Sequence, residues 1–305
     1  MSVVTAKTVD LNKLLVSAQL PAMPHSAIKI MELARNPENG PVEFTVPIEA
    51  DPGLTGQVLR FVNSSYFGFS NEISTVKLAL SLVGVRTIKN FVLWSAVFSL
   101  MPNPRCGPFN LKSLWQDSLR RALFSRLLAQ RLGYKEAEEA FSAALLQDIA
   151  VPLLAKELNS DYVELLKLRD DGKRRLSDLE QERFGWNHAQ AGGIMARQWR
   201  LPNDFSALIE MHVDPASQSL GACPQEFQTA VSLSAFLPSS VDTAWWESAQ
   251  FEQIYQGLPW KDAPALEELL DKVDQGFKEF APLLKLDQVS KTLVDLYRQG
   301  VPAAT

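Results

Sequence analysis

Residues 51–68 read DPGLTGQVLRFVNSSYFG, and this stretch combines a helix start signal with a helical pattern. The carboxylate of Asp51 can accept hydrogen bonds from the free amides of a first turn, and Pro52 suits the first helical position because no amide donor is needed there. Apolar residues then recur on one face of a helix: Leu54, Val58, Phe61 and Val62. The spacing predicts an amphipathic helix that packs one face against a core.

Helical periodicity continues towards the C-terminus. Ser74-Thr75 begins a segment whose apolar residues share one helix face, and Gly84 ends it, as glycine commonly does at a helix C-terminus. Residues 111–132 hold the longest regular pattern, which stops at Gly133. Alternating apolar and polar residues, the pattern of a half-buried strand, are nearly absent. We therefore expect an all-α fold.

A further helix is expected over residues 136–150, where Ala140, Ala143 and Ala144 would let neighbouring backbones approach closely. Pro152 must end or kink this helix, because proline lacks the amide donor. Later helices are predicted at about residues 161–169, 188–199, 203–212, 226–237, 264–281 and 287–299.

Two stretches rich in turn residues are candidate boundaries. MPNPRCGPFN (101–110) contains three prolines and a glycine, a composition that suits a linker between two helical lobes. DPASQSLGACPQ (214–225) is a second and weaker boundary. We expect two helical lobes followed by a further helical region.

Charge and cysteine content restrict the classes of function. The chain of 305 residues has a formal net charge of −5, which argues against an electrostatic grip on nucleic acid or anionic lipid. Its two cysteines, Cys106 and Cys223, show no CxxC spacing and fit a reducing compartment. The N-terminus MSVVTAKTVDLNK lacks the layout of a signal peptide, and the most apolar stretch, residues 91–101, is too short to cross a bilayer. We expect a cytoplasmic protein with neither nucleic acid nor membrane as a partner.

Gln147 and Asp148 form a polar pair inside the apolar run AALLQDIAVPLL (143–154). Such a pair is either part of a metal ligand set, a relic of one, or a hydrogen-bonding contact. The chain has three histidines; His188 and His212 lie on two other predicted helices and could join Asp148 in a cage of imidazole and carboxylate ligands. Their spacing alone is no motif. The third, His25, is expected to be a surface or capping residue.

Other features of the sequence point to no catalytic chemistry. The phosphate-binding patterns GxxxxGK[ST] and GxGxxG and the nucleophile pattern GxSxG are absent. The basic cluster Lys173-Arg174-Arg175 is expected to be solvated surface. The tryptophan-rich segment AWWESAQF (244–251) is expected to serve in packing or in a protein contact rather than as a stacking platform.

The order of the segments resembles the HDOD family, the non-catalytic relatives of HD-domain metal-dependent phosphohydrolases, over roughly residues 14–215. IEADPGLTGQVLRFVNSSYFG matches the family's DP-x-L-T…NS-x-Y-x-G pattern, and LPAMPHSAIKIMELARNP and EISTVKLALSLVGVRTIKNFVL are similar to the helices around it. LWQDSL, LLQDIA, FGWNHAQAG and LPNDFSALIEMHVDP follow in the order of the HD-like lobe. The resemblance implies four segments: an N-terminal tail (1–13), an N-terminal helical lobe (14–105), an HD-like lobe (111–218) and a C-terminal helical extension (219–305).

The resemblance also places the residual HD site. Asp117 stands where LWQDSL would bring a histidine, and Gln147-Asp148 stands for the histidine–aspartate doublet. His188 and His212 occupy places where members with more elaborate metal centres carry histidines. The closing aspartate has no counterpart, since residues 227–241 contain no acid. Gln147 is a poor transition-metal ligand because its carbonyl is neutral.

We therefore expect no catalytic residue, no metal and no other cofactor; the weak candidates for a metal site are Asp117, Asp148, His188 and His212. Instead, we expect Asp148 to contact His188, His212 or nearby backbone amides, because a buried carboxylate needs such partners. Gln147 would add hydrogen-bond donors, and the pair would join helices of the second lobe.

The resemblance implies a regulatory protein of signal transduction that acts through contacts with a protein partner, which the sequence does not identify. Two alternatives stay open. The surviving Asp148, His188 and His212 could serve a divergent metal-dependent phosphohydrolase. The old active-site cleft could instead bind a small anion or nucleotide, so that the protein senses a ligand.

Overall fold

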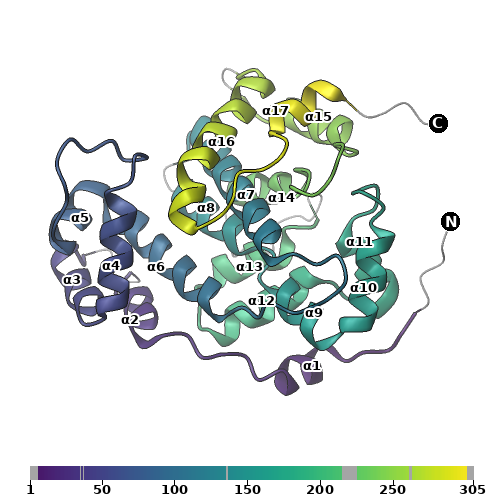
Figure 1. The fold of residues 1–305 in the computed structure, drawn as a ribbon, viewed down its shortest axis with the longest axis horizontal. Helices are drawn as coiled ribbons and strands as arrows, with labels where there is room; N and C mark the ends of the chain where they lie inside the picture. Colours follow the sequence, from purple (N-terminus) through teal and green to yellow (C-terminus); the bar gives the residue numbers. More distant parts are fainter. Residues whose placement is uncertain are drawn as a thin grey trace. The chain divides into compact units, whose positions relative to one another are not determined.

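The computed structural model describes residues 6–34, 36, 38–134, 137–214, 225–260 and 263–300. These residues form helices and connecting loops without a strand, as Figure 1 shows. The expected all-α fold is therefore confirmed. Residues 215–224 of the second predicted boundary, with Cys223, lie outside the described residues. In the described part of the chain, no helix combines the length and the apolar content that crossing a membrane requires.

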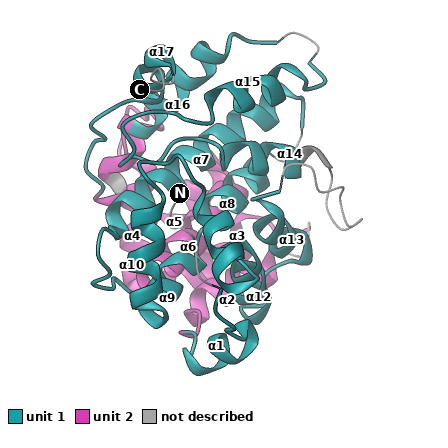
Figure 2. Ribbon diagram, turned by 90° about the vertical axis from the view of Figure 1, so that its right-hand side faces the viewer, with its two compact units in different colours: residues 1–20, 101–277, 286–305 teal, residues 21–100, 278–285 magenta. Residues whose placement is uncertain are grey.

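The chain folds into two compact units, which Figure 2 colours separately. Unit 2 consists of residues 21–100 and 278–285, and unit 1 of the described residues within 1–20, 101–277 and 286–305. Each unit buries its own set of apolar side chains.

The compact units differ from the four expected segments at both ends of the chain. The described N-terminal residues up to Leu20 belong to unit 1, where the ammonium of Lys7 bonds a carboxylate oxygen of Asp161 at 2.7 Å. Residues 278–285 of the expected C-terminal extension belong to unit 2, where the ring of Phe280 lies edge-on to Tyr66 with 4.0 Å between ring centroids. These are contacts between residues distant in sequence, which local patterns do not predict.

Unit 2 contains the helix predicted after Asp51. The carboxylate of Asp51 accepts a hydrogen bond from the amide of Leu54 at 3.0 Å, and the apolar face that follows is buried. Gly84 has a φ of 94°, a conformation that glycine adopts without a steric penalty, and it ends the next helix as expected. The helices of unit 2 are α2 (His25–Leu33), α3 (Pro41–Glu49), α4 (Pro52–Val62), α5 (Val76–Val83), α6 (Val85–Leu100) and the 3-10 helix η1 (Ala281–Leu284).

Unit 1 is organised around α7 (Leu111–Arg131), which packs against α8 (Ala137–Leu146) and α14 (Gln225–Ser234). The predicted bounds of α7 agree with the structure, and Gly133 after it has a φ of 84°. The other helices of unit 1 are α1 (Leu11–Ser17), α9 (Ala150–Glu157), α10 (Asn159–Leu168), α11 (Leu176–Phe184), α12 (His188–Gln198), α13 (Asn203–Met211), α15 (Ser248–Gln256), α16 (Leu266–Phe280, whose last three residues fall in unit 2) and α17 (Leu293–Gln299).

The helix predicted over residues 136–150 ends earlier, at Leu146. A new helix, α9, begins at Ala150 with Pro152 in its first turn, where proline is tolerated. In a continuous helix, the ring of Pro152 would clash with the carbonyl of Asp148, four residues before it. The chain therefore turns at residues 147–149, and the predicted effect of Pro152 is confirmed.

Replacing Asp51 with Ala is expected to destabilise the protein by about 1 kcal/mol, because the amide of Leu54 loses its acceptor at the start of α4. The free energy of unfolding measured in urea checks this change. Glu49→Ala, at an exposed position of the preceding helix, is the matched control and should change stability by less than about 0.5 kcal/mol. Equal effects of the two substitutions would contradict the capping role.

Candidate functional site

The turn between α8 and α9 places Asp148 at the junction of several helices of unit 1. The amide of Ile149 donates to the carbonyl of Leu146 at 3.1 Å, and the amide of Val151 donates to the carbonyl of Asp148 at 3.0 Å. The turn that Pro152 imposes thus keeps its backbone hydrogen bonds. Asp148 itself is buried, so its carboxylate must find partners within the protein.

The glycine pair Gly192-Gly193 lets α12 pack very closely against α13. A Cβ added at the first glycine would lie 2.9 Å from a methyl carbon of Ile209, and one added at the second would lie 2.7 Å from a side chain of α13. Both distances are shorter than side chains tolerate. His188 begins α12 and His212 follows the last residue of α13, and their rings lie 5.3 Å apart between centroids. Close packing of these two helices therefore brings the two histidines together.

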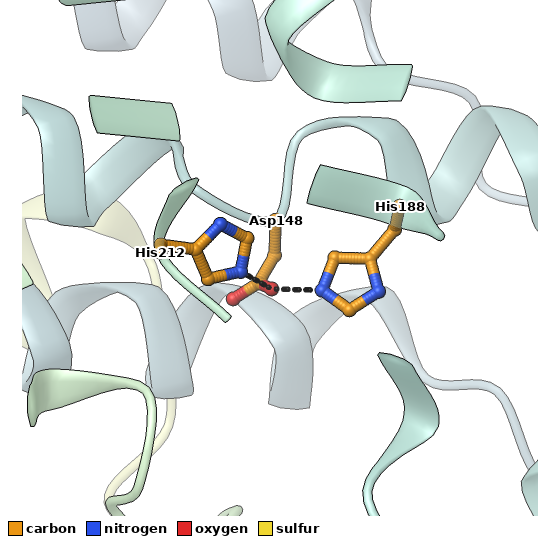
Figure 3. A group of neighbouring side chains, drawn as sticks. All are labelled: Asp148, His188 and His212. Carbon is orange, nitrogen blue, oxygen red and sulfur yellow. Dashed lines mark ion pairs between the residues drawn. The ribbon is translucent and has the colours of Figure 1, made fainter. Parts of the chain in front are cut away.

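Asp148, His188 and His212 form one buried cluster, shown in Figure 3. One carboxylate oxygen of Asp148, Oδ1, lies 3.2 Å from Nε2 of His188 and 3.5 Å from Nε2 of His212. The residues are only 5%, 5% and 1% exposed, respectively. The expected contact of Asp148 with the two histidines is thus present. The third histidine, His25, is exposed at the first residue of α2 in unit 2.

The far side of each imidazole is held by a hydrogen-bond acceptor. Nδ1 of His188 lies 2.6 Å from Oε2 of Glu180, and the same oxygen accepts the backbone amide of His188 at 2.8 Å. The hydroxyl of Tyr162 donates to the other oxygen of Glu180. Nδ1 of His212 lies 2.7 Å from the carbonyl oxygen of Ile209. Because both acceptors lack protons, each histidine must carry a proton on Nδ1, and each Nε2 is turned towards Asp148.

Arg121, on α7, binds the other oxygen of Asp148. Its guanidinium donates from Nη1 to Oδ2, so the two carboxylate oxygens have separate partners. Burial alone would raise the pKa of Asp148, but the Arg121 guanidinium beside it and a hydrogen bond from His188 hold that pKa well below its usual range. Asp148 is therefore an anion despite its burial.

The two histidines differ in charge. Burial acts to lower the pKa of His188, but the carboxylates of Glu180 and Asp148 on either side of the ring raise it from 6.5 to about 10. Burial lowers the pKa of His212, whose Nδ1 faces a neutral carbonyl. At neutral pH His188 is a cation and His212 is uncharged. The anions Asp148 and Glu180 are then matched by the cations Arg121 and His188.

Two predicted site positions lie outside this cluster. Asp117 accepts hydrogen bonds from the Ser239 hydroxyl and, at 2.6 Å, from the Ser240 amide, so its oxygens are bound to the loop after α14. Within the described residues it is not part of the group that could hold a metal ion. Both oxygens of Asp117 thus have partners within the protein, and its role as a metal ligand stays a prediction.

Gln147 is fully buried and turns towards α14. Its Oε1 accepts a hydrogen bond from the Ser234 hydroxyl at 3.3 Å, which joins the α8–α9 turn to that helix. Its Nε2 has no partner in the described part of the chain. The prediction that Gln147 joins helices is confirmed, whereas the prediction that it contributes additional donated hydrogen bonds is wrong.

The residues do not fit the metal centre of a catalytic HD domain. Asp117 is bound elsewhere, Gln147 points to α14, and Oδ2 of Asp148 is bound to Arg121. The remaining donor atoms on Asp148, His188 and His212 lie within 4.8 Å of one another, a geometry sufficient for at most one ion. Two protein cations already balance the charge of the cluster.

Arg121 and Glu180 belong to the cluster but were not predicted from the sequence. Arg121 follows Asp117 by four residues, so the two share a face of α7, and this spacing is a signal for Arg121. Glu180 lies in LSDLEQERF, where several acids alternate with polar residues, and nothing local separates it from its exposed neighbours.

Comparisons with known proteins agree with this architecture. The sequence model of the HDOD domain family matches residues 20–215 of the chain. An uncharacterised protein of Treponema pallidum is 21% identical over 218 residues, and the uncharacterised protein YuxH of Bacillus subtilis is 29% identical over 124 residues. These regions cover 71% and 41% of this chain but only 41% and 29% of the two relatives. The chain thus spans less than half the length of these relatives.

Solved structures share the fold. A Geobacter sulfurreducens HDOD domain protein of unknown function has a TM-score of 0.64 and 21% identity, covering 93% of this chain and 91% of that one. A Shewanella amazonensis protein named as a candidate phosphohydrolase has a TM-score of 0.66 and 19% identity, with 94% and 98% coverage. A Marinobacter aquaeolei protein named as a candidate signal transduction protein has a TM-score of 0.69 and 18% identity, with 93% and 62% coverage. At these identities the likeness concerns the fold alone.

Replacing Arg121 with Met is expected to destabilise the protein by about 3–5 kcal/mol, because it removes one partner of a buried ion pair and leaves the Asp148 carboxylate undercompensated. Adding Asp148→Asn to this variant should restore part of the loss, since the uncompensated charge is then gone. The free energy of unfolding in urea measures both effects.

Arg131→Met is the matched control for this prediction. Arg131 lies on the same helix, but its pair with Glu268 is exposed and 3.7 Å long, so its loss should cost no more than about 1 kcal/mol. Similar losses for the two arginine variants, or no recovery on adding Asp148→Asn, would show that Arg121 does not neutralise Asp148.

Stability is expected to fall as the pH rises from about 6.5 to about 10. The folded state keeps a proton on His188 in this range, whereas the unfolded chain loses it near 6.5, so rising pH favours unfolding. NMR of the imidazole nitrogens checks the assignment, with single His→Gln variants identifying the three signals. The His188 signal should remain that of an imidazolium above pH 8, and a titration of His188 near 6.5 would contradict the arrangement.

Proposed function

The chain belongs to the HDOD domain family, and we propose that it is a non-catalytic regulatory protein that acts through contacts with a protein partner. The observation that carries this proposal is the charge compensation of Asp148 by Arg121 and His188. Hydrolysis by an HD-type centre depends on metal ions that bind and activate a water molecule. Here the positive charge near the surviving aspartate belongs to the protein itself.

Asp117 and Gln147, the two predicted site positions outside the cluster, support the same proposal. Asp117 holds the loop at Ser239 and Ser240, and Gln147 holds Ser234 of α14. The side-chain oxygens of both residues therefore bind other elements of unit 1 rather than a metal ion. The name of the Marinobacter aquaeolei relative in the structural comparison, a candidate signal transduction protein, is compatible with this role.

Exposed aliphatic side chains on unit 2 support the protein-contact part of the proposal. Val42 and Val46 lie one turn apart on α3, and Leu78 and Leu82 lie one turn apart on α5; all four are exposed. The two helices pack against each other. Exposed apolar residues grouped on neighbouring elements are typical of surfaces that bind other proteins.

One observation favours a second candidate function, a divergent metal-dependent phosphohydrolase. In both histidines Nδ1 is held by an acceptor, as it is in metal-ligating histidines, and Nε2 is turned towards Asp148. In addition, the uncharged His212 presents a lone pair to Asp148, a contact in which no proton is shared. An ion bound there would be held by Asp148, His188 and His212, and it would supply Lewis acidity towards a phosphate group.

Hydrolysis assays distinguish the two functions. We expect purified protein supplied with Mn²⁺, Fe²⁺ or Zn²⁺ to show no turnover of phosphomonoesters, nucleotides or cyclic dinucleotides above that of Asp148→Ala. Metal analysis after reconstitution should show less than one bound ion per chain. Stoichiometric metal together with turnover that disappears in Asp148→Ala would refute the non-catalytic role and establish the phosphohydrolase.

A further inference from the structure

The outer face of α3 in unit 2 is apolar and open to water. Val42 and Val46 lie one turn apart on this face, and Val46 is 69% exposed. α3 packs against both α2 and α5, which have few contacts with each other, and Figure 1 shows α3 between them. The two valines therefore lie in the middle of a layer of three helices, where a partner that covers them would remove apolar surface from water.

One flank of this layer is an apolar ridge on α5. Leu78 and Leu82 lie one turn apart on it, and both are exposed. Two large aliphatic residues at positions i and i+4 are the spacing with which a helix inserts side chains into a groove of another protein. Lys77 is exposed beside them, so the ridge also carries a positive charge.

The opposite flank is an open groove between α2 and α3, with a volume of about 720 Å³. Val46 belongs to its wall, so the groove continues the apolar face of α3. Its apolar lining consists of Pro24, Leu33, Val46, Pro47, Ala50 and Pro52. The layer thus has a ridge on one side of α3 and a groove on the other.

The two flanks are also complementary in charge. Glu43, on the groove side of α3, is exposed and caps this helix with one carboxylate oxygen, which accepts the amide of Gly40 at 2.9 Å. Lys29, on the α2 wall of the groove, is paired at 3.4 Å with Glu32 of its own helix. Lys77 on the ridge, in contrast, forms no ion pair with any other described residue. A ridge with an unpaired base and a groove with an exposed acid favour contact with each other.

We propose that this surface joins two copies of the chain across a two-fold axis that runs parallel to α3, between the facing valines. Rotation about this axis places the α5 ridge of each copy over the α2–α3 groove of the other and brings Lys77 towards Glu43. Each contact is then made twice, as in other dimers with two-fold symmetry. The inference names a partner for the surface that the proposed function uses, and its regulatory meaning rests on that proposed function.

A second copy covers this surface better than a single helix of another protein does. A helix that lay in the groove would contact Leu33 and Ala50 but leave the leucines of the ridge in water. A second copy fills the groove with its own ridge and has its groove filled in turn. The valines of α3 and the leucines of α5 are then removed from water together.

Sedimentation velocity at chain concentrations from about 5 to about 300 µM tests the proposal. We expect a reversible rise towards twice the mass of one chain, with no larger species. Val46→Asp should raise the dissociation constant at least about tenfold, because it places a carboxylate at the apolar centre of the interface. Leu82→Asp should do the same from the ridge, and circular dichroism verifies that both variants are folded.

Val16→Asp is the matched control. Val16 is 73% exposed on α1, against 69% for Val46, and it belongs to unit 1, outside the proposed surface. The same substitution there should leave the dissociation constant unchanged. A single chain at all concentrations, species larger than two chains, or equal effects of Val16→Asp and Val46→Asp would each overturn the proposal.

Cysteine cross-linking tests the arrangement of ridge and groove. Leu82→Cys and Lys29→Cys, each combined with Cys223→Ser, are mixed and treated with a short bismaleimide; Cys106 is 2% exposed and out of its reach. Dimers should be cross-linked in the mixture but not in either variant alone. Cross-linking of Leu82→Cys with itself would place the two ridges together and overturn the arrangement.

Hydrolysis assays on the same preparations separate this inference from the proposed function. A dimer without turnover supports both. A dimer with metal-dependent turnover that disappears in Asp148→Ala would support the dimer and refute the non-catalytic role. A single chain without turnover would overturn the dimer and leave the non-catalytic role in place.

Discussion

The packing of unit 1 depends on the neutralisation of one buried carboxylate. Asp148 is 5% exposed, and an isolated charge at such a depth would cost more free energy than a marginally stable domain has available. Arg121 on α7 and His188 at the start of α12 supply the opposite charge from two directions. Glu180 on α11 keeps His188 protonated, so a third helix contributes to the neutralisation of Asp148. One charge thereby fixes the mutual positions of three helices and the α8–α9 turn.

Two local features of the backbone, at Pro152 and Gly192, bring the residues of the cluster together. Pro152 makes α8 end before Asp148, which would otherwise lie within a continuous helix. Gly192 lacks the side chain that would hold α13 away from α12. Both act through steric exclusion, which is short-ranged and insensitive to charge. The electrostatic contacts then select one arrangement among those that the backbone allows. This order of causes explains how one buried carboxylate can hold several helices of unit 1 together.

The sequence predicted features whose causes are local and missed those whose causes are distant. The bounds of α7 and the start of α4 were predicted accurately because helix caps and apolar spacing are properties of consecutive residues. Asp148, His188 and His212 were grouped as possible ligands on separate predicted helices, and the family resemblance then supported this grouping, since their separations in sequence carry no motif. Glu180 was missed because an acid in a polar helix looks solvated until the packing of α10 and α12 around it is known. Residues 278–285 join unit 2 for a similar reason, through aromatic contacts that span most of the chain.

A buried carboxylate held by protein cations responds to different signals from one held by a metal ion. A metal centre is assembled when an ion arrives, whereas a guanidinium is always charged and always present, so the cluster around Asp148 keeps its geometry without an external ion. Sensitivity to a signal must then come from surfaces that the cluster supports rather than from the cluster itself. A cavity beside the cluster is such a surface: Asp148, His188 and His212 line it, and so does Asp171, whose carboxylate accepts a hydrogen bond from the Thr243 amide in the segment after α14.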